Sequence, residues 1–112
     1  MVKDISIYME TKFNFKSAIC TSRSQSERLL ALGLKKETAD CCYYYYDGEY
    51  LIAFAEDAKY PSDIPAWSLH RLMILAEMKG TAFSDLDVAY ETTISIIAAK
   101  IRFGYFNKEY LV

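Results

Sequence analysis

The residues that could carry out catalysis are few in this chain of 112 residues. The sequence contains one histidine, His70, and three thiols, those of Cys20, Cys41 and Cys42. Ser68 and His70 lie two positions apart in a segment predicted to be helical, so their side chains would point about 200° apart. A thiol beside His70 would combine a nucleophile with a base, but no spacing in the sequence favours such a pair. We therefore expect no catalytic residue and a protein that is not an enzyme.

Acidic residues and cysteines have simpler explanations than catalysis or metal binding. Glu56 and Asp57 lie in a polar loop, where both charges are solvated. Asp85 and Asp87 lie where a helix is expected to start, and acids are favourable there. A zinc site needs more ligands than one histidine and irregularly spaced cysteines supply, so the thiols are interpreted as small apolar residues. Four scattered glycines form no phosphate-binding loop, and we expect neither a metal nor a cofactor.

Composition restricts the class of protein further. A chain of this length is expected to form a single domain over residues 1–112. Hydrophobic residues make up 53% of the chain, and a formal net charge of −2 creates no global field for nucleic acid or an anionic membrane. The N-terminus lacks the apolar core of a signal peptide, and no apolar run is long enough to span a bilayer. These features predict a soluble cytoplasmic protein without membrane association.

The segment CCYYYYDGEYLIAF, residues 41–54, predicts a β-hairpin. Asp47 and Gly48 are preferred in a two-residue type I′ turn, because both central positions need a positive φ. This turn places Tyr46 opposite Glu49 and sets the register of all following pairs. One face, the aromatic face, is expected to lie in the core: Cys41, Tyr43, Tyr45, Tyr50, Ile52 and Phe54. The other, the mixed face, is expected to meet solvent or a partner: Cys42, Tyr44, Tyr46, Glu49, Leu51 and Ala53.

A first helix is predicted over about residues 23–32. Two candidate capping boxes lie at its start: Ser22 with Gln25, and Ser24 with Glu27. Gly33 lies where a helix needs a left-handed residue at its end. Leu34 after it is placed to contact Leu29, as in a Schellman ending.

A second helix is predicted over residues 65–79, because Pro65 suits the first helical position and Gly80 suits the end. Residues at helical spacing form one apolar stripe: Ala66, Leu69, Leu72, Met73 and Ala76. Three large apolar residues lie off this stripe: Trp67, Ile74 and Met78. A helix that is apolar on more than one side is sandwiched between other elements or contacts another subunit.

Ser84 and Gly104 mark the start and the end of a third predicted helix. Its buried side is expected to consist of Leu86, Tyr90, Thr93, Ile94, Ile97 and Ile101. The aromatic tail after it, residues 105–112, is expected to pack on the domain. Together these elements predict an α+β fold with a β-hairpin packed against about three α-helices. Residues 1–20 alternate in part, so they supply either a third strand or a loosely held arm.

Three blocks of the sequence resemble a known family. The blocks are CTSRSQSERLLALGLKKETADC, DIPAWSLHRLM and GYFNKEYLV, and they set the order of the predicted elements. They resemble a family of small uncharacterised proteins from gut anaerobic bacteria, often encoded in phage-like or mobile regions. The first dozen residues and the stretch between Met73 and Tyr90 are not part of this resemblance. It implies an accessory cytoplasmic protein and supplies no catalytic residue, ligand or activity.

These features favour a protein-interaction or accessory module over an enzyme. The candidate interaction surface combines the mixed face with the off-stripe helix residues: Tyr44, Tyr46, Leu51, Trp67, Ile74 and Met78. For Trp67 the alternative is that it fills the gap between helix and hairpin. The partner would be another protein or a second copy of the chain in a homodimer. The alternative function is a nucleic-acid-associated regulator that uses a basic patch near the first helix: Arg23, Arg28, Lys35 and Lys36.

Overall fold

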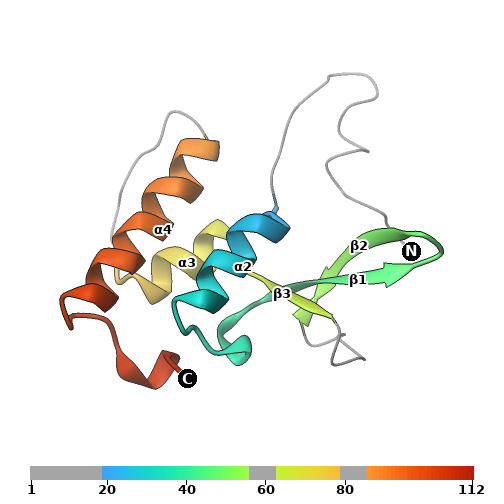
Figure 1. Cartoon of the computed structure of the whole chain (residues 1–112). Coiled ribbons are helices and arrows are strands. Elements are labelled where there is room, and N and C mark those ends of the chain that lie inside the picture. The colour runs from blue at the N-terminus through green and yellow to red at the C-terminus, as the bar shows by residue number, and fades with distance from the viewer. Residues whose placement is uncertain (1–18, 56–62, 79–85) are drawn as a thin grey trace.

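A computed structural model describes residues 19–55, 63–78 and 86–112 of the chain, which adopt an α+β fold (Figure 1). The helices in these ranges are α2 (Arg23–Ala31), α3 (Leu69–Leu75) and α4 (Leu86–Arg102). Two short 3₁₀ helices, η1 (Lys36–Thr38) and η3 (Lys108–Tyr110), accompany them. The strands are β1 (Cys41–Tyr46), β2 (Glu49–Phe54) and β3 (Ile64–Ala66), which form an antiparallel sheet in the order β2-β1-β3. The predicted fold class is confirmed.

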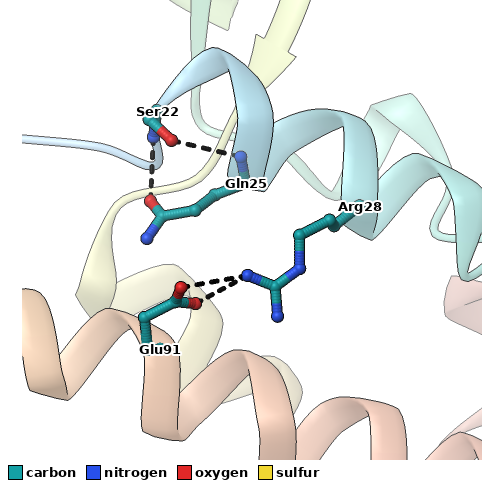
Figure 2. A network of polar contacts seen from close by, with 4 residues as sticks. All are labelled: Ser22, Gln25, Arg28 and Glu91. Atoms are coloured by element: carbon teal, nitrogen blue, oxygen red, sulfur yellow. Dashed lines mark hydrogen bonds and ion pairs between the residues drawn. The ribbon is translucent and has the colours of Figure 1, made fainter.

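Helix α2 starts and ends through local signals in the sequence. Of the two candidate capping boxes, Ser22 with Gln25 is the one that forms (Figure 2). The Ser22 amide donates to the Gln25 side chain at 2.9 Å, and the Gln25 amide donates to the Ser22 hydroxyl at 3.1 Å. At the other end Gly33 has a φ of 101°, and the Leu34 amide donates to the Leu29 carbonyl at 3.2 Å. The predicted helix and its Schellman ending are confirmed.

The hairpin forms in the predicted register, from Tyr46 opposite Glu49 to Cys41 opposite Phe54. Both turn residues, Asp47 and Gly48, have positive φ angles of 49° and 85°, as a type I′ turn requires. A third strand is present, but it is β3, which follows the hairpin and pairs with β1. The segment that was predicted to supply a strand or an arm at the N-terminus lies outside the described residues, apart from its last two.

The predicted start of the second helix is wrong. Pro65 lies in β3, and α3 begins only at Leu69 with Ser68 as its N-cap. A carboxylate from the end of η1 determines this start: the Ser68 amide and hydroxyl donate to Asp40 at 2.8 Å and 2.5 Å. Proline suits an edge strand as well as a first helical turn, so this tertiary contact decides between the two.

Helix α3 also ends before the predicted position. Glu77 adopts a left-handed φ of 58°, and the Met78 amide donates to the Met73 carbonyl at 2.9 Å. This is the geometry of a Schellman ending with a glutamate in the position that glycine usually takes. Gly80, the predicted end, lies outside the described residues.

Helix α4 and the tail complete the core. The residues predicted to lie on its buried side do so where they are described: Tyr90, Thr93, Ile94 and Ile97 are buried, and Ile101 packs against the core. Gly104, with a φ of 79°, ends the helix as predicted, whereas Ser84 lies outside the described residues. The tail packs, because the Lys35 amide donates to the Tyr110 carbonyl at 2.8 Å and the Val112 amide donates to the Gly33 carbonyl at 2.7 Å.

The helices and the hairpin occupy different parts of the molecule. The main core lies among α2, α3 and α4, and its largest member is Trp67. Helix α2 contacts the sheet at β3, and α3 packs on α4. The hairpin of β1 and β2 projects away from the three helices (Figure 1). Strand β2 is therefore the strand of the sheet that lies farthest from the helical layer.

Candidate interaction surface

Trp67 is not a surface residue, which corrects its place in the predicted interaction surface. Its side chain is 0% exposed, and its indole N–H donates to the Thr38 hydroxyl at 3.0 Å. Its backbone exchanges two hydrogen bonds with Thr21: the Thr21 amide donates to the Trp67 carbonyl, and the Trp67 amide donates to the Thr21 hydroxyl. The alternative, that Trp67 fills the gap between helix and hairpin, is correct in that the side chain is buried, but the core that it joins is the one formed by the helices.

Polar groups around Trp67 are satisfied by neighbours from several elements. The Thr38 hydroxyl donates to the Lys35 carbonyl at 2.7 Å while it accepts from the indole. The buried hydroxyls of Thr21 and Ser26 are 2.8 Å apart. These bonds join the start of α2, η1 and β3, and among the described side chains no buried polar atom lacks a hydrogen-bond partner. The region around Trp67 therefore stabilises the fold and offers no free group to a ligand.

The predicted assignment of the two hairpin faces to core and solvent is wrong at several positions on each face. On the aromatic face, Tyr45 is 65% exposed, Tyr50 is 40% exposed and Phe54 is 67% exposed. On the mixed face, Cys42 and Leu51 are buried, so Leu51 is not a surface residue either. Alternation showed correctly which residues share a face. On the aromatic face of β2, however, Ile52 packs against buried residues while Tyr50 and Phe54 stay exposed, because α2 contacts the sheet mainly at β3.

The remaining predicted contact residues are distributed over two places. Tyr46 is 60% exposed near the hairpin turn, and Tyr44 beside it on the mixed face is half-buried. Ile74 is exposed on α3, whereas Met78 packs partly against the core. The structure therefore does not bring the six predicted residues together into one surface.

The exposed hairpin residues, which we define as Tyr45, Tyr46, Tyr50 and Phe54, are the largest group of uncovered aromatic side chains within one described element pair. Tyr45 and Tyr50 lie opposite each other, with ring centroids 5.2 Å apart in an edge-to-face arrangement. The Arg23 guanidinium lies 4.3 Å from the Tyr50 ring centroid. Sequence reasoning missed Tyr45, Tyr50 and Phe54 because it placed them in the core.

The four residues of the predicted basic patch differ in their surroundings, and two of them contact other residues of the chain. Arg23 stacks on Tyr50, and Arg28 donates from one guanidinium nitrogen to both carboxylate oxygens of Glu91 at 3.1 Å and 2.8 Å (Figure 2). Lys35 is half-buried, while Lys36 is exposed on η1. The structure thus gives two of the four cations a partner within the chain, which weakens a continuous basic surface.

An open groove lies between η1, α3 and η3 with a volume of about 670 Å³. Both signs of charge line it, with Lys35 and Arg71 beside Glu37 and Glu109, and Ile74 supplies apolar surface. One Arg71 nitrogen also donates to the Thr38 carbonyl at 3.3 Å. The lining has no net charge that would select a ligand.

The residues with possible chemistry do not form a site. Cys20, Cys41 and Cys42 are buried, whereas His70 is exposed on α3. The pKa of the Cys41 thiol is raised, mainly by a hydrogen bond with the Cys20 thiol and secondly by burial. The thiolate form of Cys41 is therefore disfavoured. Over residues 19–55, 63–78 and 86–112 there is no group of three or more acids, histidines and cysteines that could hold a metal ion.

Comparisons of the chain with family models, with curated proteins and with solved structures found no match. Within the part of the chain that the structure describes, no helix is both long enough and apolar enough to cross a membrane.

Proposed function

We propose that the chain is a non-enzymatic protein-interaction module that binds its partner through the exposed hairpin residues. The observation that carries this proposal is the exposure of Tyr45, Tyr46, Tyr50 and Phe54 on a hairpin that projects from the helices (Figure 1). Three of these residues, Tyr45, Tyr50 and Phe54, share one face, and Tyr46 lies on the other face beside the turn. Exposed apolar and aromatic groups that lie together on a surface mark interaction sites.

Aromatic side chains are suited to this role. A fully enclosed aromatic ring buries about 150–250 Å², of which the exposed part is gained on association, and tyrosine adds a hydroxyl that bonds at the edge of an interface. Tyrosine and arginine are enriched among the residues that dominate binding energy, and Arg23 lies on the Tyr50 ring. The hairpin also presents these rings in a defined register, because twelve strand residues form six consecutive pairs.

Affinity capture from the native host tests this function. The wild-type chain is compared with Tyr45→Ser/Tyr46→Ser, which removes exposed rings near the turn, and with Tyr105→Ser, which removes an exposed ring after α4. We expect one protein to be enriched by the wild type and by the Tyr105 variant but not by the double variant. Purified partner then confirms direct binding by calorimetry, and equal capture by all three chains would contradict the proposal.

The nucleic-acid alternative has less support. Arg28 is paired with Glu91, and the groove near Lys35 carries two acids as well as two cations. Only the stacked pair of Arg23 and Tyr50 resembles a surface on which bases stack. We expect no shift of single-stranded or double-stranded DNA or RNA at low salt, and a salt-dependent shift would favour this alternative instead.

The proposal includes an accessory role in the cytoplasm, in agreement with the family resemblance noted for the three sequence blocks. The association with phage-like or mobile regions is part of the same proposal. Cell fractionation of the native host tests the location, and the protein is expected in the cytoplasmic fraction.

A further inference from the structure

The hydrogen-bonding directions along β2 follow from its pairing with β1. The Ala55 amide donates to the Asp40 carbonyl at 3.1 Å, so this pair bonds across the hairpin. In an antiparallel ladder, bonded and non-bonded pairs alternate, and the pairs at Ala53, Leu51 and Glu49 are therefore the bonded ones. The amides of Tyr50, Ile52 and Phe54 and the carbonyls of Tyr50 and Ile52 consequently point to the outer edge of β2, whereas the Phe54 carbonyl accepts from the Cys42 thiol at 3.7 Å.

The two edges of the sheet differ in their protection against pairing. Strand β3 spans only three residues, and its central residue is Pro65. Pro65 lies opposite Cys42, whose own backbone groups bond to β2, so the missing N–H of Pro65 falls on the outer edge. A short strand with an outward proline is a device that blocks the addition of another strand.

Strand β2 carries none of these devices. It spans six residues, EYLIAF, without proline or lysine and with Glu49 as the one charged residue. In the described part of the chain, β1 is the one strand that pairs with it. An unprotected edge with exposed aromatic residues is the type of edge that accepts a strand from another chain.

We propose, in extension of the protein-interaction function above, that the partner of this edge is β2 of a second copy, paired antiparallel about a two-fold axis at Ile52. In this register Ile52 faces the partner's Ile52, and Tyr50 faces the partner's Phe54 on both sides of the axis. These three facing pairs exchange about four backbone hydrogen bonds, or about six if the Phe54 carbonyls also accept from the partner. The two three-stranded sheets become one continuous sheet.

The sequence of β2 is complementary to itself in this arrangement. Tyr50 and Phe54 both lie on the aromatic face and are both exposed, so each exposed ring meets another aromatic ring. Facing aromatic pairs are favourable across antiparallel strands. Glu49 falls opposite the partner's Ala55, which keeps the acid of each copy away from the acid of the other. A two-fold interface needs this property, because the same patch must fit itself.

A strand edge buries less area than the roughly 1,200 Å² of the smaller specific interfaces, so the dimer is weak. We expect a dissociation constant between about 10 μM and about 1 mM. Analytical ultracentrifugation of the full chain over this range measures the dimer. Two double variants at the same positions test its register: Tyr50→Lys/Phe54→Lys places like charges opposite each other, and Tyr50→Lys/Phe54→Glu places opposite charges there.

The expected result is a dimer of the wild-type chain, a dissociation constant raised at least about tenfold in the Lys/Lys variant, and recovery in the Lys/Glu variant. Circular dichroism of both variants shows that they fold alike. A wild-type monomer at about 1 mM, or equal dissociation constants of both variants, overturns the proposal. Failure of the dimer proposal would leave the protein-interaction function standing. A monomeric chain that still captures another protein through Tyr45 and Tyr46 would support that function without the dimer.

Discussion

Trp67 and the exposed hairpin residues are two aromatic regions with opposite surroundings. Trp67 is fully buried, and its indole and backbone groups bond to threonines from other elements. Tyr45, Tyr50 and Phe54 share a face of the hairpin and stay exposed, although Arg23 at the start of α2 lies on the Tyr50 ring. Aromatic content alone therefore does not locate a binding surface. What locates it is which aromatic residues the helices leave exposed.

The largest difference between the two regions is expected in folding stability. Trp67→Ala is expected to lower the free energy of unfolding by about 3–5 kcal/mol, because it leaves a cavity and removes the hydrogen bond to Thr38. Tyr45→Ala, at an exposed position, is expected to change it by less than about 0.5 kcal/mol. Urea denaturation monitored by circular dichroism measures both free energies. Tryptophan fluorescence is unsuitable, because Trp67 is the one tryptophan of the chain and the variant lacks it. Equal losses in the two variants would contradict the comparison.

Stability at alkaline pH is expected to depend on Tyr90, which packs beside α3. Burial raises the pKa of Tyr90 to about 12, although its oxygen accepts a hydrogen bond from the Leu69 amide. Since the folded chain holds this proton more tightly than the unfolded chain, the stabilisation is complete below about pH 10 and is lost as the pH rises to about 12.

The total effect of this titration is expected to be at most about 2–3 kcal/mol. Urea denaturation between about pH 8 and about pH 12 measures it against Tyr90→Phe, which cannot ionise at this position. The variant is expected to lose less stability over the range than the wild type. Parallel curves for the two chains would show that Tyr90 does not titrate in this way.

A smaller loss of stability is expected from removing the N-cap of α3. Ser68→Ala removes the hydroxyl that accepts from the Arg71 amide at 3.1 Å and donates to Asp40. A loss of about 1–2 kcal/mol in unfolding free energy is expected. Ser24→Ala is the control, because Ser24 is exposed within α2 and is not its cap. A comparable loss in the control would show that capping is not the cause.

The smallest effect is expected at two residues that, within the described part of the chain, have a positive φ without being glycine: Glu77 after α3 and Asp47 at the hairpin turn. Glu77→Gly is expected to stabilise the fold by about 0.5–1 kcal/mol, because glutamate is strained at a φ of 58°. Asp47→Gly at the hairpin turn is expected to be close to neutral, since aspartate tolerates the left-handed region. Thermal unfolding of both variants measures the difference, and a destabilised Glu77→Gly chain would exclude strain at this position.

Local chemistry made much of this fold predictable. The positive φ angles required at Asp47 and Gly48 set the hairpin register, and glycines at positions 33 and 104 set the ends of two helices. Such signals depend on residues close in sequence, so no tertiary structure is needed to interpret them.

The features that sequence reasoning missed depend on contacts between distant residues. Asp40 binds Ser68 and so moves the start of α3 beyond Pro65, a choice that the sequence around Pro65 leaves open. The exposure of Tyr50 and Phe54 depends on where α2 ends against the sheet. Alternation along a strand shows which residues share a face, but it contains no information about how far a helix covers that face.

Hydrogen–deuterium exchange of the full chain at several concentrations tests the central claim most directly. We expect the outward amides of Tyr50, Ile52 and Phe54 to gain protection as the concentration rises from about 10 μM to about 1 mM. The indole N–H of Trp67 is expected to stay protected throughout, because it is buried and bonded to Thr38. If the protection of these outward amides does not change with concentration, whether it is low or high throughout, the proposed pairing of two β2 strands is contradicted.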